Sequence, residues 1–175
     1  INVISAAEMK DAIINEVNKG IQQNGNDDDN YGPDLIIMAA AVADYKPAEV
    51  SEQKIHKAGD MDLHLSRTED ILFSVRKARE SASSYHSISG NLCVVGFAAE
   101  TENIEQSALS KMERKGLNMI VSNDVSRKDI GFASNENEVT IYIKGSEPIH
   151  VPKEAKSSVA SIILGHVLTK FFSEE

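Results

Sequence analysis

An apolar run that ends in very small side chains limits the folds open to this chain more than any other feature. Residues 35–38 read Leu-Ile-Ile-Met, and three alanines follow before Asp44, Tyr45 and Pro47. An unbroken apolar run of this length is typical of a parallel strand that is buried on both faces. Ligands of open α/β sheets bind beyond the carboxyl ends of such strands. The run therefore predicts either a ligand-binding strand end or an ordinary strand whose alanines serve only for packing.

Helix-like and strand-like segments alternate along the chain. Strand-like runs occupy 1–4, 35–38, 62–66, 92–95 and 117–121, and apolar residues recur at helical spacing in 5–21, 68–78, 104–116 and 153–172. Ser5 and Glu8 form a capping-box pattern, and Thr68 is a candidate capping hydroxyl. The alternation predicts an α/β fold of three layers, Rossmann-like, with a mostly parallel sheet and helices on both faces. The segments 139–143 and 149–151 predict an appended β-hairpin.

Length and charge exclude several classes of partner. The chain has 175 residues and a formal net charge of −9, which suits one domain without the basic surface that nucleic acids and anionic membranes require. No apolar stretch approaches the roughly 20 residues of a membrane span. Cys93 is the only cysteine, so a disulfide framework is excluded and a buried, inert thiol is expected. We expect a cytoplasmic domain that binds neither nucleic acid nor membrane.

Two strand-like runs end in small residues followed by an acid. Asp44 follows the alanines of the first run, and Glu100 follows Gly96-Phe97-Ala98-Ala99 in the second. Two such strand ends can form the floor of a nucleotide pocket, and Phe97 could stack on a base. A carboxylate just past a strand can bind a ribose hydroxyl, a base amine or a divalent cation.

The lysines allow two interpretations, phosphate binding or ordinary exposure to solvent. Lys111 and Lys115 lie four residues apart on one helix face, which would suit either a triphosphate or plain solvent. Lys54 lies in a polar segment that could close over a phosphate or be ordinary surface. The sequence contains no Walker A, G-x-G-x-x-G or G-x-S-x-G motif, and its five histidines lack metal-ligand spacing. The residues alone therefore predict an α/β domain that binds a nucleotide or another small anion.

Seven short segments together resemble the bacterial phosphopantothenate–cysteine ligases. They are Ala40–Tyr45, Lys54–Lys57, Thr68–Leu72, Gly96–Thr101, Lys115–Ile120, Asn123–Ser126 and Gly131–Phe132. Their order and spacing match the family over nearly the whole chain, so as a set they are specific.

The resemblance implies a ligase of coenzyme A synthesis that condenses 4′-phosphopantothenate with L-cysteine. Its co-substrate would be CTP, which converts the acid to an acyl-cytidylate, and its cofactor would be Mg²⁺. The preference for CTP over ATP comes from the bacterial members and not from the side chains. FMN is implied only if the ligase is fused to the flavin-dependent decarboxylase that acts on its product. A homodimer is implied, with 123–151 as the expected contact, and a larger assembly in a fused protein.

The resemblance also assigns roles to individual residues. Lys54 would be the catalytic lysine of a mobile loop, and Asp44 would bind the nucleotide and help hold the metal. The nucleotide contacts would come from Met38, Ala39, Ala40, Asp44, Lys54, Glu69, Asp70, Ile71, Leu72, Phe97, Lys111 and Lys115. The family often has proline where this chain has Glu69.

One departure from the family is large. A Gly-rich strand–loop–helix and an Asn/Ser/Ser/Gly segment precede this region in the family and are not found in residues 1–175. We therefore expect a ligase domain over 1–175 that lacks its N-terminal nucleotide-binding segment and does not ligate unaided. The alternatives are a non-catalytic Rossmann-type nucleotide-binding domain and, less favoured without the glycine motif, an NAD-dependent oxidoreductase.

Overall fold

The computed structural model describes residues 1–21, 31–56, 59–82, 84–87, 89, 91–124 and 134–173. The elements found in these residues follow one another in the order α1 (Ala6–Ile21), β1 (Leu35–Met38), β2 (Tyr45–Pro47), β3 (Leu65–Arg67), α2 (Ile71–Ser81), β4 (Cys93–Glu100), α3 (Ile104–Lys115), β5 (Met119–Asp124), β6 (Glu136–Ile143), β7 (Ile149–Ala155) and α4 (Lys156–Phe171). None of the helices in these ranges is long and apolar enough to cross a membrane.

The main sheet has the strand order β1-β4-β5-β6-β7. The β1–β4 and β4–β5 pairs are parallel, whereas β6 pairs antiparallel with both β5 and β7. It follows that β6 alone runs against the other four strands of this sheet. The predicted mostly parallel sheet with an appended hairpin, β6–β7, is therefore confirmed.

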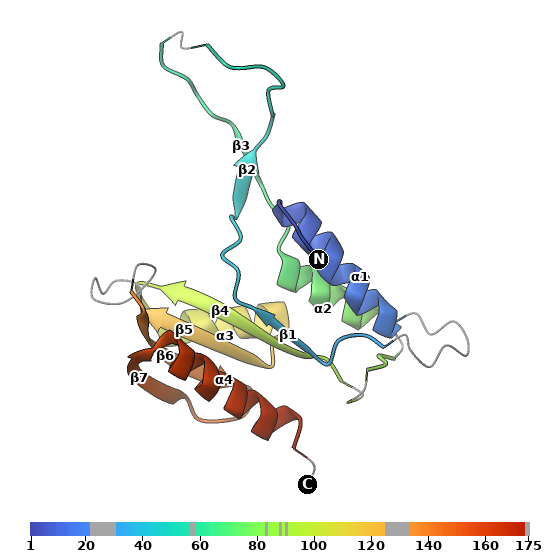
Figure 1. The fold of residues 1–175 in the computed structure, drawn as a ribbon, viewed down its shortest axis with the longest axis vertical. Helices are drawn as coiled ribbons and strands as arrows, with labels where there is room; N and C mark the ends of the chain where they lie inside the picture. The colour runs from blue at the N-terminus through green and yellow to red at the C-terminus, as the bar shows by residue number, and fades with distance from the viewer. Residues whose placement is uncertain are drawn as a thin grey trace.

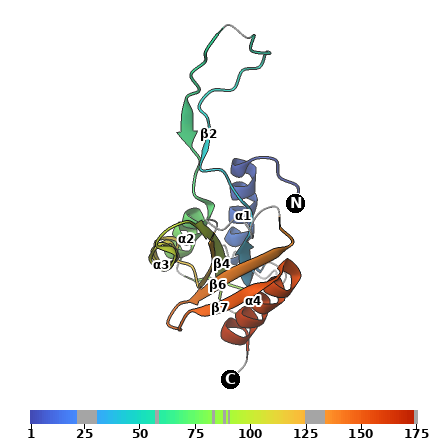
Figure 2. The ribbon, with the colours of Figure 1, turned by 90° about the vertical axis from the view of Figure 1, so that its left-hand side faces the viewer.

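Helices cover both faces of the sheet and make three layers (Figures 1 and 2). Alternate residues of β4 point to opposite faces: Val94 and Ala98 pack in one core cluster with residues of α1, α2 and α3. Cys93 and Val95 pack in the other cluster, where Val159, Ile163 and Val167 come from α4. The helical spacing of these apolar residues thus positions the helices over the sheet as predicted. Leu109 is an exception, since it is 41% exposed.

The helix ends are held by specific caps. The Ser5 hydroxyl accepts from the Glu8 N–H at 3.2 Å, and the Glu8 carboxylate accepts from the Ile4 N–H at 2.7 Å, so the predicted capping box at α1 is confirmed. At α2 the prediction was wrong. Asp70 is the N-cap, accepting from the Phe73 N–H at 3.2 Å, whereas the Thr68 hydroxyl donates to the Ala43 carbonyl.

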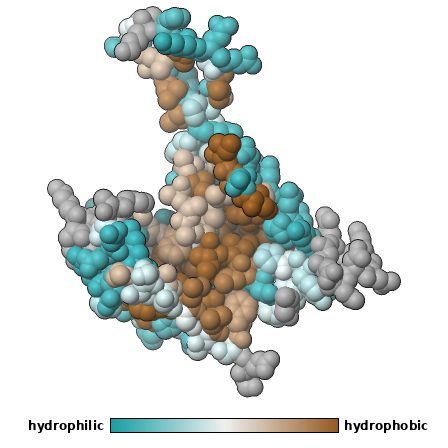
Figure 3. Space-filling view, in the orientation of Figure 1, coloured by the Kyte–Doolittle hydropathy of each residue, from teal (hydrophilic) through white to brown (hydrophobic). Residues whose placement is uncertain are grey.

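Two strand predictions also need correction. Residues 1–4 form no strand. The Ile4 N–H bonds to the Glu8 carboxylate in the α1 cap, and Ile1 and Ile4 are 91% and 97% exposed. In the part of the chain that the structure describes, β1 lies at an edge of the sheet and pairs only with β4. Its Ile37 is 37% exposed, so β1 is not buried on both faces. Figure 3 shows apolar side chains gathered on the face where β1 lies.

A two-stranded arm, residues 45–67, projects from the sheet body (Figures 1 and 2). In it β2 pairs antiparallel with β3, with Tyr45 opposite Arg67 and Pro47 opposite Leu65. The strand predicted at 62–66 is therefore shifted toward Arg67, and its partner at Tyr45–Pro47 was not predicted. The arm carries apolar side chains that are more than half exposed: Val50, Ile55, Met61, Leu63 and Leu65.

Candidate active site

Parallel strands place several predicted residues at one edge of the sheet, which we term the carboxyl edge. Met38 ends β1 opposite Gly96, and β4 continues for four more residues to Glu100, opposite Asp124 of β5. The extension of β4 through residues 96–100 was not predicted, because the small residues there read as a loop. Ala39 and Ala40 follow β1 and are exposed, as a ligand-contacting backbone requires.

Both predicted phosphate lysines are ion-paired, Lys111 at this edge and Lys115 in the last turn of α3, the end that leads into β5. Lys111 of α3 pairs with Glu100 at the end of β4. The Lys115 ammonium lies 3.1 Å from the Asp70 carboxylate at the start of α2. The side chains of Glu100 and Lys115 are 14% and 22% exposed. Each lysine thus holds its charge beside a carboxylate, with the Lys111 side chain 36% exposed, and the binding of a triphosphate by the two lysines stays a prediction.

Asp70 connects two parts of the site. One carboxylate oxygen caps α2 and the other pairs with Lys115. Ile71 and Leu72 are 4% and 7% exposed, so these two predicted contact residues are buried in the structure. Glu69 pairs with Lys10 of α1, a partner that sequence reasoning missed. The hydrogen bond from Lys10 lowers the pKa of Glu69, and the same bond raises the pKa of Lys10.

Asp44 lies at the base of the arm beside the start of α2. Its backbone carbonyl accepts from the Thr68 N–H at 2.9 Å, which places Asp44 close in space to the 69–72 segment. The described residues offer its exposed carboxylate no hydrogen-bond or ion-pair partner, and they contain no group of three or more His, Cys, Asp or Glu that could hold a metal. Mg²⁺ bound to a nucleotide needs only one or two protein carboxylates. Asp44 thus fits a cation that arrives with a triphosphate.

Two predicted residues are not brought to the lysines. Phe97 is 42% exposed and, by strand alternation, lies on the same face of β4 as Val95, opposite the face covered by α3. Lys54 lies in the segment of the arm beyond β2 and β3, away from the sheet body (Figure 1). Its neighbour Lys57 is outside the described residues. The predicted site is therefore divided between the carboxyl edge, the opposite sheet face and the arm.

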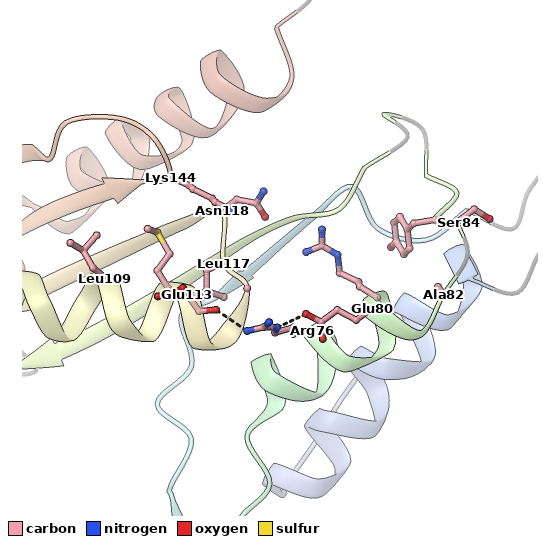
Figure 4. Close-up of a pocket in the computed structure, with 13 residues that line it drawn as sticks. Arg76, Glu80, Ala82, Ser84, Leu109, Glu113, Leu117, Asn118 and Lys144 are labelled. Atoms are coloured by element: carbon pink, nitrogen blue, oxygen red, sulfur yellow. Dashed lines mark hydrogen bonds and ion pairs between the residues drawn. The ribbon is translucent and has the colours of Figure 1, made fainter.

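A cavity of about 870 Å³ lies at the other edge of the sheet, between the ends of α2 and α3 (Figure 4). Asn118, just before β5, and Lys144, just after β6, line it together with Arg76, Arg79 and Tyr85. Burial raises the pKa of Tyr85 to about 12, and its hydroxyl donates to the Pro33 carbonyl at 2.9 Å. Sequence analysis assigned none of these residues to a cavity, although Asn118 lies in one of the seven segments, because their contacts join distant parts of the chain.

Comparison with known proteins identifies the family. The model of the DNA/pantothenate metabolism flavoprotein C-terminal domain matches residues 1–171. The chain belongs to this family. The coenzyme A biosynthesis bifunctional protein CoaBC of Vibrio vulnificus strain YJ016 is 34% identical over 172 residues, which cover 97% of this chain and 37% of that protein. The protein of the same name from Bacillus subtilis strain 168 is 34% identical over 168 residues, 95% of this chain and 36% of that protein.

A solved structure shares the fold of this family domain. The crystal structure of the C-terminal domain of a CoaBC protein is 31% identical, with a TM-score of 0.66. The match covers 97% of this chain and 64% of that chain. The resemblance drawn from the seven short segments is thus confirmed at the level of the family. The chain spans less than half the length of the two curated relatives.

Proposed function

We propose that this family domain takes part in joining 4′-phosphopantothenate to L-cysteine, with CTP as co-substrate and Mg²⁺ as cofactor. The observation that carries the proposal is the pair of lysines on α3, each held by a carboxylate from a different element. Triphosphates are bound by ammonium groups of this kind. Membership of a pantothenate-metabolism family supplies the substrate class.

The reaction has two steps. A carboxylate oxygen of phosphopantothenate attacks the α-phosphorus of CTP, and the bond from that phosphorus to the bridging oxygen breaks, so that pyrophosphate leaves. The cysteine amine then attacks the acyl carbon, the bond to the CMP oxygen breaks, and the amine loses a proton to solvent. The first step concentrates negative charge on the departing phosphates, which is where cationic side chains stabilise a transition state.

Each of the predicted site residues would have a separate role in this reaction. Lys111 and Lys115 would exchange Glu100 and Asp70 for phosphate oxygens when the nucleotide binds. The exposed Asp44 carboxylate would hold Mg²⁺, which supplies charge neutralisation on the phosphates when bound. The exposed backbone at Ala39 and Ala40 would lie against the nucleotide. Lys54 would act only when the outer part of the arm approaches the edge.

We also propose a cytoplasmic homodimer, and FMN only for a protein that carries the decarboxylase. The expected contact region, 123–151, includes β6, whereas its residues 125–133 lie outside the described part. The exposed apolar side chains of the arm are a second surface that favours association. Light scattering of the intact protein tests the dimer, and a monomer at micromolar concentration would contradict it.

A Lys54→Ala variant of the intact protein tests the catalytic assignment. We expect pyrophosphate release with CTP, phosphopantothenate and cysteine to fall by about 10²–10³-fold, while calorimetry shows CTP binding largely kept. Lys170→Ala, at an exposed position near the end of α4, is the matched control and should keep full activity. Full turnover by Lys54→Ala would remove Lys54 from catalysis.

The same assay separates the competing functions. CTP binding without any turnover in the unmodified intact protein would favour a non-catalytic nucleotide-binding domain. For the 175 residues alone we expect no turnover, since they cover only 64% of the solved C-terminal domain. Turnover by this chain unaided would contradict that expectation.

A further inference from the structure

Arg76 joins helix α2 to the last turn of helix α3. Its Nη1 group donates to the carbonyls of Glu113 and Arg114, at 2.8 Å each. Its Nε group donates to the Glu80 carboxylate at 2.6 Å, one turn further along α2. Figure 4 shows the guanidinium between Glu113 and Glu80, at the edge of the cavity. The side chain is 34% exposed, so these bonds are partly shielded from water.

The stem of Arg76 packs where α3 ends. Gly116 closes the helix in the left-handed region, with φ 64°, and a Cβ there would meet the Arg76 Cγ and Cδ atoms at 3.2 Å. The last carbonyls of a helix have no partner within the helix and carry partial negative charge. The Arg76 guanidinium donates to two of them, of which the Glu113 carbonyl also accepts from the Gly116 N–H at 3.2 Å. Charge-assisted bonds in the fixed geometry of a guanidinium are not reproduced by a lysine ammonium.

The turn that Arg76 caps is the turn that carries Lys115. Arg114, one of the two capped residues, is its immediate neighbour, and Lys111 lies one turn earlier on α3. Lys115 in turn pairs with Asp70 at the start of α2. Helices α2 and α3 are thus linked at two points, Arg76 to the α3 carbonyls and Asp70 to Lys115. Both helices contribute predicted nucleotide contacts.

We infer that Arg76 is a positioning residue, which fixes the last turn of α3 against α2 so that Lys115 is held ready for the triphosphate. Arg76 lies on the cavity side of this contact, so it acts through α3 without touching the nucleotide. This inference rests on the proposed function. The inference goes beyond the proposed function because it makes nucleotide affinity depend on a residue outside the carboxyl edge.

Substitutions on α2 test the inference in the intact protein. Arg76→Lys keeps the charge and loses the two-carbonyl geometry, and Arg76→Ala loses both. The coupling energy between residues of one hydrogen-bond network typically corresponds to about a tenfold change in a dissociation constant. We expect the Kd for CTP to rise by about that factor in Arg76→Lys, with the KM for cysteine unchanged. Arg79→Lys is the control, since Arg79 lines the same cavity but forms no side-chain hydrogen bond or ion pair in the described part.

A double-mutant cycle with Lys115→Ala separates positioning from stability. If Arg76 acts through Lys115, Arg76→Lys should raise the Kd by less than about twofold in the Lys115→Ala background. Full additivity, or an unchanged Kd with only a lowered melting temperature, would overturn the inference. Failure of the unmodified protein to bind CTP would instead overturn the proposed function.

Discussion

The sheet body and the arm differ in what holds their apolar side chains. Met119 and Ile141 are fully buried between the sheet and α4, whereas Met61 and Leu63 on the arm are 65% and 61% exposed. Burying one such side chain contributes about 1.5–3 kcal/mol to stability, and an isolated two-stranded ribbon is marginal in water. The body is therefore stabilised by its own contacts. The apolar residues of the arm contribute little in this conformation and are available for contacts made during function.

The largest effect expected from this contrast is on stability. Ile141→Ala leaves a cavity in the core behind β6, and we expect the free energy of unfolding to fall by about 2–5 kcal/mol. Leu63→Ala removes a comparable side chain from the arm and should change it by less than about 0.5 kcal/mol. Urea denaturation of both variants measures the difference. A cost for Leu63→Ala similar to that for Ile141→Ala would mean that the arm packs against the body or a second copy.

A second pair of variants tests whether close packing, and not simply a position in the sheet body, determines the change in stability. Gly20 and Gly165 both lie in helices of the body. A Cβ on Gly20 would lie 2.8 Å from the His86 carbonyl oxygen, a backbone atom, whereas a Cβ on Gly165 meets nothing within 4 Å. We expect Gly20→Ala to destabilise by about 1–3 kcal/mol.

Gly165→Ala should stabilise by roughly 0.5–1 kcal/mol, because alanine is the better helix former. Differential scanning calorimetry of the two variants gives the signs. Equal effects at both glycines would show that helix propensity, and not the contact between α1 and residue 86, decides stability at these positions.

The body was predictable because its signals are local. The capping box of Ser5 and Glu8 marks the start of α1, and Val159, Ile163 and Val167 show the buried side of α4 by their spacing alone. The alternation of strands and helices then restricts the topology to a mostly parallel sheet. Each of these features depends on residues within a few positions of one another.

What the sequence did not predict depends on distant partners. An apolar run such as 35–38 reads the same in a central strand and at an edge, so the exposure of Ile37 was missed. Asp70 replaces Thr68 as the cap of α2 because the Thr68 hydroxyl is bound to Ala43, 25 positions away. The two partners of Arg76 on α3 lie 37 and 38 positions away. At the site, the sequence named Lys111 and Lys115 and also Glu100 and Asp70, but it did not predict that each lysine pairs with one of these carboxylates.

The smallest expected effect is on the pH dependence of stability, and it comes from the carboxylate of Asp34, just before β1. Burial raises the pKa of Asp34, but hydrogen bonds from the Ser89 backbone and from the Ser89 and Ser87 hydroxyls outweigh it, so the pKa lies below its ordinary value of 3.8. The Ser89 N–H lies 2.7 Å from the carboxylate. Because the folded state binds this proton less readily than the unfolded chain, stability is present above pH 3.8 and is lost as the pH falls through the folded pKa.

Asp34→Asn keeps an acceptor for Ser89 but removes the charge, so we expect a shallower loss of stability as the pH falls below 3.8. Asp62→Asn on the arm is the control, because the described residues give its exposed carboxylate no hydrogen-bond partner. Urea denaturation at several pH values measures both. If Asp62→Asn flattens the profile as much as Asp34→Asn does, the carboxylate of the arm is also bound in solution, and the contrast between body and arm does not extend to charge.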